Sequence, residues 1–194
     1  TKADAARQLG LEPLAKIIMS QKEFNIDSRA SQFVNGQIKS KEEALKGAQD
    51  IIAEWINENK VAREIVRTHF ERNAYISSKI VKGKNEEAEK FEDYFKFEEK
   101  LSRCKSHRIL AIRRGENEGF LKVSIRPDDG GAIERLNKLF IKSDISGSIE
   151  AAIKDSYKRL LAPSIENEFN ALSKKLADEE AIKVFAENLK QMWQ

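Results

Sequence analysis

The sequence predicts a mostly α-helical fold, a multi-helix bundle with one short β element. Residues that break helices are scarce, with 9 Gly and 3 Pro among 194 residues, while Lys and Glu are abundant. Apolar residues recur every three or four positions along most of the chain, which is the helical period. The hydrophobic fraction of 40% is enough for a sizeable core. We therefore expect either one domain or two lobes, residues 1–74 and 75–194.

Helix boundaries are marked clearly in the first 74 residues. Gly10 suits the end of a first helix, and Pro13 suits the first turn of the next. Ser40 followed by Glu43 fits a capping box at the start of a third helix. The period is interrupted at residues 57–59 and then resumes, which predicts two consecutive helices.

One strand is predicted with a clear pattern. Residues 120–126 alternate apolar and polar side chains until Pro127, as in a half-buried strand. Residues 75–81 are the best candidate for its partner strand, because they are rich in β-branched side chains. The intervening residues 85–95 show a helical pattern, with acidic residues on what we expect to be a solvated face.

The stretch "SHRILAIRRGENEG" predicts a short central helix. Ser106 suits its N-cap and Gly115 the residue just past its end. Residues 109–112 place apolar side chains nearly all round the helix, which predicts burial. Arg113 and Arg114 would then lie at the C-terminal end, where the helix dipole favours cations.

The C-terminal third is also helical in pattern. A helix over residues 149–161 precedes Pro163, which would open the next helix. The period shifts its phase near Asp178. The last thirty residues therefore form either one long helix or two helices that meet there.

Five segments in order resemble one protein family. They are "LGLEPLAKII", "KIVKGKNEEAEKFEDYFKF", "SHRILAIRRGENEGFLKV", "SYKRLLAPSIENE" and "AIKVFAENLKQ". Together they are similar to the N-terminal and central helical region of Tex, the bacterial transcription accessory protein family, from about Leu9 to Gln191. The chain starts without Met and ends within a helical pattern, so we expect a segment of a longer protein.

The resemblance implies a cytoplasmic nucleic-acid-binding factor. It implies that this helical region, with a helix-turn-helix-like element, is a platform for three downstream domains that are absent from this sequence. These are an RNase-H-like domain, a helix-hairpin-helix domain and an OB-fold that binds RNA. The implied partners are therefore RNA or DNA, bound mainly through the absent domains, and proteins of the transcription machinery.

Positive charge is concentrated in the middle of the chain. The net charge is only +3, yet residues 75–115 contain eleven basic and seven acidic residues. No acid lies between Lys100 and Arg114. Lys and Arg clusters neutralise phosphates without reading sequence. The candidate phosphate contacts are Lys82, Lys84, Lys105, Arg108, Arg113 and Arg114.

Lys105, Arg108, Arg113 and Arg114 are not expected to form one flat patch, and only a concave groove could use all four together. On a helix Arg108 and Arg113 point about 140° apart, at 100° per residue. Our hypothesis is therefore a weak, sequence-independent contact by Lys82, Lys84, Arg113 and Arg114. Two structural explanations compete with this hypothesis: the charges lie on an ordinary solvated surface, or they pair with the acids of residues 86–93.

No catalytic constellation is recognisable, and we expect no enzymatic activity, metal or cofactor. The single cysteine, Cys104, excludes an intrachain disulfide, and His69 and His107 are too far apart for a close Cys/His metal site. Ser106 and His107 are adjacent on a helix, so their side chains diverge. We expect Cys104 to be buried and inert.

Two further expectations concern location and partners. No apolar run approaches the roughly 20 residues that span a bilayer, and no signal peptide is recognisable, so a cytoplasmic protein is expected. The alternative function is a protein–protein docking module without nucleic-acid contact, favoured by aromatic residues, which are common at interfaces. These aromatic residues are Phe24, Phe33, Trp55, Tyr75, Tyr94 and Trp193.

Overall fold

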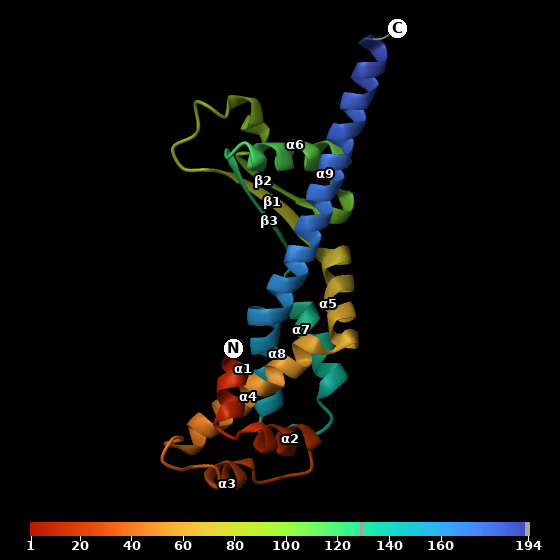
Figure 1. Cartoon of the computed structure of the whole chain (residues 1–194). Coiled ribbons are helices and arrows are strands. Elements are labelled where there is room, and N and C mark those ends of the chain that lie inside the picture. Colours follow the sequence, from red (N-terminus) through yellow and green to blue (C-terminus); the bar gives the residue numbers. More distant parts are fainter. Residues whose placement is uncertain (129, 193–194) are drawn as a thin grey trace. The chain divides into compact units, whose positions relative to one another are not determined.

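The structure is a computed structural model that describes residues 1–128 and 130–192, so that Trp193 lies outside the described residues. It divides into two compact units (Figure 1). The first contains Thr1–Arg67 and Asp129–Ser164, and the second contains Thr68–Asp128 and Ile165–Gln194. Residues 130–164 thus fall in the same unit as the N-terminal helices, whereas the predicted boundary between lobes lies after residue 74.

The first unit is all helical and is organised around one helix, α4 (Lys41–Glu58). Helices α1, α2, α3 and α8 all pack on α4. The bounds of the other elements are α1 Lys2–Gln8, α2 Glu12–Ser20, α3 Ile26–Ser31, α5 Lys60–Asn73, α7 Gly130–Phe140, α8 Ser148–Ser156 and the π-helical η3 Tyr157–Leu161. Only the part of α5 up to Arg67 belongs to this unit.

The ends of α4 follow the expected signals. The Ser40 side chain accepts a hydrogen bond of 3.2 Å from the backbone N–H of Glu43, and α4 ends at Glu58. A single residue, Asn59, separates it from α5, which confirms the predicted interruption. The break at Gly10, with φ +79°, and the restart with Pro13 in the first turn of α2 are also confirmed.

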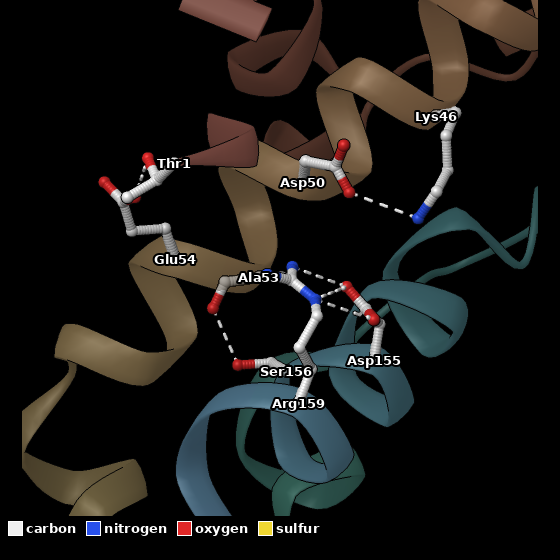
Figure 2. A network of polar contacts seen from close by, with 8 residues as sticks. All are labelled: Thr1, Lys46, Asp50, Ala53, Glu54, Asp155, Ser156 and Arg159. Carbon is white, nitrogen blue, oxygen red and sulfur yellow. Dashed lines mark hydrogen bonds and ion pairs between the residues drawn. The ribbon is translucent and has the colours of Figure 1, made fainter. Parts of the chain in front are cut away.

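The core of this unit lies between α4 and α8. Ile52, Ile56, Ile153 and Tyr157 are fully buried. A polar network beside this core also joins the two helices (Figure 2). The Ser156 hydroxyl donates to the carbonyl of Ala53 at 2.6 Å. Arg159 makes three hydrogen bonds with Asp155, four residues earlier in the same helical segment. Packing and the hydrogen bond between Ser156 and Ala53 therefore hold α4 and α8 together.

The second unit contains a three-stranded antiparallel sheet with strand order β2-β1-β3. The strands are β1 Tyr75–Ile80, β2 Lys96–Lys100 and β3 Leu121–Arg126. The predicted strand and its predicted partner are confirmed, because β1 pairs with β3. The remaining elements are η1 Glu89–Tyr94, η2 Leu101–Arg103 and α6 Ser106–Asn117. The unit also contains the end of α5 from Thr68 and helix α9, Ala162–Met192, from Ile165 onward.

One face of this sheet packs against α6 (Figure 1). Ile76, Leu121 and Ile125 on this inner face are buried, and so is Ile112 of α6. The close approach requires Gly115, because a Cβ there would lie 2.5 Å from Cδ1 of Leu121. Gly115 is therefore an interior residue of α6 rather than its end, and the chain turns at Gly119, with φ +83°.

The C-terminal residues form one long helix. Helix α9 runs without interruption from Ala162 to Met192, which settles the choice between one helix and two. The π turn η3 precedes Pro163, where the backbone N–H of Ala162 bonds to the carbonyl of Tyr157. Pro has no N–H and crowds the carbonyl four residues earlier, so a widened turn at this position accommodates it.

Helices occupy well over half of the described residues, so the mostly α prediction is confirmed. The sheet is larger than the single short β element that was predicted, because β2 pairs with β1. The helix-turn-helix-like element stays a prediction. Within the described ranges, no helix combines the length and the apolar character that a membrane span needs.

Candidate nucleic-acid interface

All six candidate phosphate contacts lie in the second unit, at three positions. Lys82 and Lys84 lie in the turn after β1, on either side of Gly83, whose φ is +85°. Lys105 precedes α6 as its N-cap residue. Arg108, Arg113 and Arg114 lie on α6 itself, as the sequence predicted.

Arg113 is an internal residue, with only 3% of its surface exposed. Its Nε donates to Oγ of Ser173 at 2.8 Å, and its two terminal nitrogens donate to Asn170 and Glu116. Three partners therefore engage the guanidinium, and two of them belong to α9. The expectation that Arg113 contacts phosphate does not fit this burial, because its donors bind α9 and Glu116 instead.

Arg108 is also engaged by an acidic partner. One of its terminal nitrogens lies 2.9 Å from a carboxylate oxygen of Glu99 on β2. The hydrogen bond with Glu99 and the charge of that carboxylate raise the pKa of Arg108 above its ordinary value. A phosphate would have to compete with Glu99 for this guanidinium.

The carboxylate of Glu99 also affects the pKa of the Cys104 thiol. Burial and the nearby Glu99 raise the pKa of Cys104 to about 11. The thiol is therefore protonated at neutral pH, which makes it a poor nucleophile. Cys104 is half-buried rather than fully buried.

Four candidates are exposed, namely Lys82, Lys84, Lys105 and Arg114. Lys84 lies 3.6 Å from Glu87. Among the residues that the structure describes, Lys82, Lys105 and Arg114 have no acidic partner. Four of the six candidates thus present cations to solvent.

The exposed candidates fall at opposite ends of α6. The backbone N–H of Val81 donates to the carbonyl of Phe120, whose own N–H donates to Gly115. This chain of bonds places the turn of Lys82 beside the C-terminal end of α6, where Arg114 lies. Lys105 is nine residues earlier along the helix, which corresponds to about 14 Å. Lys82, Lys84 and Arg114 therefore lie near one another, and Lys105 lies apart from them.

A groove runs along α6 and α9 next to Arg114. It has a volume of about 610 Å³ and is lined by both helices. Arg114 and Lys174 line it together with the acids Asp178 and Glu180. This mixture of charges does not make the groove a uniformly positive channel.

The outer face of the sheet contains further cations that the sequence analysis did not select. Lys79 of β1 is paired in register with Lys96 of β2 and with Lys122 of β3, and all three are exposed. Four residues back along β1, Tyr75 is paired with Lys100 and Arg126. The pairing of β1 with β3 was predicted, so that Lys79 and Lys122 could have been placed on neighbouring strands. Lys96 could not, because β2 was not predicted.

The two histidines differ in their surroundings. His69 is buried, and its ring nitrogens contact the carbonyl of Asp128 and the side chain of Asn73. His107 is exposed on the first turn of α6. In the described part of the chain, no three His, Cys, Asp or Glu side chains gather as a metal site would require.

Comparison with known proteins identifies the family. Residues 21–185 match the family described as Tex central region-like. The chain is 35% identical to the uncharacterized protein YdcI of Bacillus subtilis and 32% identical to the transcriptional accessory protein Tex of Neisseria gonorrhoeae. It is 30% identical to the human S1 RNA-binding domain-containing protein 1.

Each of these alignments includes 99% of this chain but only 28%, 26% and 21% of the respective relative. The chain therefore spans about a quarter of the length of the proteins it matches. The similarity extends through both units, including the sheet and α6. On this evidence the chain belongs to the Tex family and corresponds to its central region.

Proposed function

We propose that this chain is a non-catalytic helical scaffold that positions nucleic-acid-binding domains in a cytoplasmic transcription accessory protein. A minor part of its role is a weak contact with the phosphate backbone. The names of two relatives support the proposal, because one is a transcriptional accessory protein and another contains an S1 RNA-binding domain. Both relatives are about four times as long as this chain or longer, so they have room for such domains.

The observation that most favours a scaffold is the surface of α9. Ile182, Phe185, Leu189 and Met192 are exposed to between 40% and 80%. At 100° per residue these four side chains lie within an arc of about 80°. Exposed apolar side chains gathered on one face are typical of a surface that another protein surface covers. We infer that this stripe receives a further domain or a partner.

The proposed phosphate contact uses the four exposed candidates and omits Arg113. Lys82, Lys84 and Arg114 lie toward one end of α6, and Lys105 extends the set to the other end. Contacts of this type attract the backbone of RNA or DNA without sequence preference. Arg113 instead joins α6 to α9, and this supports the scaffold.

Nucleic-acid binding at two salt concentrations tests this proposal. The variant K82Q/K84Q/K105Q/R114Q should bind RNA, single-stranded DNA and duplex DNA more weakly and roughly uniformly across sequences. The slope of log affinity against log salt should become shallower by about 3. A matched control, K16Q/K39Q/K60Q/K154Q, removes the same charge from exposed lysines of the first unit and should change neither quantity.

A protein-docking module without nucleic-acid contact is the second candidate. The exposed stripe of α9 favours it, and so does Phe24, which is 80% exposed. Salt discriminates the two functions, because apolar docking hardly depends on ionic strength and phosphate binding depends on it steeply. If the chain binds no nucleic acid even at low salt, the docking module becomes the better description.

A further inference from the structure

We infer that the outer face of the three-stranded sheet is a binding platform for single-stranded nucleic acid, with phosphates on a row of three lysines and a base on Tyr75. This inference rests on the proposed nucleic-acid role and assigns it to a surface separate from the α6 end. Its residues come from all three strands: Lys79, Lys96, Lys122, Tyr75, Ser77 and Ser124.

The lysine row is the first observation. Lys79 lies directly opposite Lys96 on one side and Lys122 on the other. Strands lie about 4.8 Å apart, so the row extends about 10 Å across the sheet. In the part of the chain that the structure describes, none of the three has an acidic partner. Like charges directly opposite each other destabilise a sheet, and a bound polyanion would remove that repulsion.

Protection of sheet edges does not account for this row. Lysines on edge strands prevent pairing with other chains, and this explanation would suffice for Lys96 and Lys122. Lys79, however, lies on the central strand β1, where both edges are already hydrogen-bonded. Its position between two other lysines therefore points to an anionic ligand.

Tyr75 is the second observation. It lies at the other end of the same face, in a hollow of about 310 Å³ lined also by Ser77, Ser124, Glu98, Arg126 and Asp128. The ring is half-buried, and in the described chain its hydroxyl makes no hydrogen bond. An aromatic ring among hydroxyl groups and charged side chains suits a nucleobase, which stacks on the ring and bonds at its edges.

The geometry favours one strand over a duplex. Tyr75 and Lys79 are four residues apart on β1, or about 13 Å. A few nucleotides of a flexible strand bridge that distance, with one base unstacked onto Tyr75. In a duplex the bases are already stacked and paired, so Tyr75 would have nothing to receive. Arg126 is held by Glu166 at 2.7 Å and shapes the hollow rather than the lysine row.

Binding of the whole 194-residue chain to labelled oligonucleotides tests the inference. The probes are oligo-U RNA, oligo-dT and a DNA duplex of equal length, followed by fluorescence anisotropy across a salt series. The variant K79Q/K96Q/K122Q should flatten the salt slope for both single strands by about 2. The control K16Q/K39Q/K154Q, which removes three exposed lysines from the first unit, should leave the slope unchanged.

Substitution of Tyr75 tests the stacking part separately. Y75L should lower affinity for single strands roughly 5- to 100-fold without changing the salt slope, and should leave duplex affinity unaltered. Y75F should retain the affinity of the wild type. If Y75L is poorly folded by circular dichroism, photocrosslinking of 4-thiouridine RNA to the wild type should identify Tyr75 or a neighbour in the hollow by mass spectrometry.

The outcomes separate this inference from the proposed function. If the wild type binds no nucleic acid even at low salt, this inference and the phosphate contact of the proposed function are both wrong, while the scaffold role is not affected. If the α6-end variant K82Q/K84Q/K105Q/R114Q weakens binding while the sheet variants match their control, the proposed function stands and the platform is wrong. Equal competition by polyglutamate would also overturn the inference, because it would show a site for acidic chains in general.

Discussion

Arg113 shows how the surroundings of a residue decide its role. It follows Ile112 and precedes Arg114, which is exposed, yet its guanidinium is enclosed by Ser173, Asn170 and Glu116. A buried cation is tolerated only when its donors are satisfied and a counter-charge is near. Glu116 supplies that charge at 2.9 Å. Arg113 is therefore a structural residue that fixes α6 to α9.

Replacing Arg113 should destabilise the protein strongly. R113Q leaves the buried hydroxyl of Ser173 and the half-buried amide oxygen of Asn170 without their donor, so the free energy of unfolding should fall by about 2–4 kcal/mol. R113K keeps the charge but cannot donate to all three partners in the same geometry. Its free energy of unfolding should therefore lie between those of R113Q and the wild type. Urea unfolding followed by circular dichroism measures both.

The neighbouring residue provides the control. R114Q removes an exposed cation and should change stability by no more than about 0.5 kcal/mol. Equal effects of R113Q and R114Q would contradict the burial of Arg113.

The sequence could not distinguish the buried Arg113 from the exposed Arg114. The dipole argument placed Arg113 and Arg114 at one helix end and treated them alike. What separates them is contact with side chains 57 and 60 residues further along the chain, which no local pattern records. Charge clustering selected the four exposed cations as candidates, and their contact with phosphate stays a prediction.

At the scale of elements, local signals predicted the helices and strands that have strong periodicity or caps. The start of α4 at Ser40 and the strand β3 are examples. Strand β2 was missed because "KFEEK" contains one apolar residue and no alternation that is visible in isolation. Its pairing with β1 determines its conformation, and that is a tertiary effect. The lysine row of the outer face was missed for the same reason.

The contact between α6 and β3 gives a prediction at this scale. G115A should lower stability by about 1–3 kcal/mol, because the added methyl group would overlap the buried side chain of Leu121. The loss should appear even though Ala favours a helix over Gly by about 1 kcal/mol. Thermal unfolding measures the change.

Gly36 is the matched control for this substitution. A Cβ added there would have open space, so G36A should be neutral or slightly stabilising. A G115A protein as stable as the wild type would mean that α6 lies further from β3 than the structure shows.

At the scale of the whole molecule, charge is balanced in each unit. The first contains seventeen basic and fifteen acidic residues, and the second contains eighteen and seventeen. Neither unit attracts a polyanion over long distances by its net charge. Any binding must therefore depend on local arrangements such as the lysine row, and should be weak at physiological salt.

The stability of the chain should depend on acid through Asp155. The hydrogen bond and charge of Arg159 hold the pKa of Asp155 below its ordinary value. A carboxyl group with a lowered pKa in the folded state stabilises the protein above its unfolded pKa of about 3.9. That contribution is lost as the pH falls through the lower folded pKa.

The variant D155N tests this dependence. It should be less stable than the wild type at pH 7, and the difference should shrink as the pH falls below about 4. Urea unfolding midpoints of D155N and the wild type, measured between pH 7 and about 3, test this expectation. A constant difference at all pH values would show that the ion pair with Arg159 makes no contribution.

The protonated thiol of Cys104 has a practical consequence for spectroscopy. It is the only cysteine in the sequence, and at neutral pH a pKa of about 11 leaves very little thiolate. A cysteine introduced at an exposed site, as in Lys16→Cys, has a pKa of about 8.5 and reacts with maleimides on the order of a hundred-fold faster. A fluorophore can thus be attached to such an introduced cysteine, in either unit, without first removing Cys104.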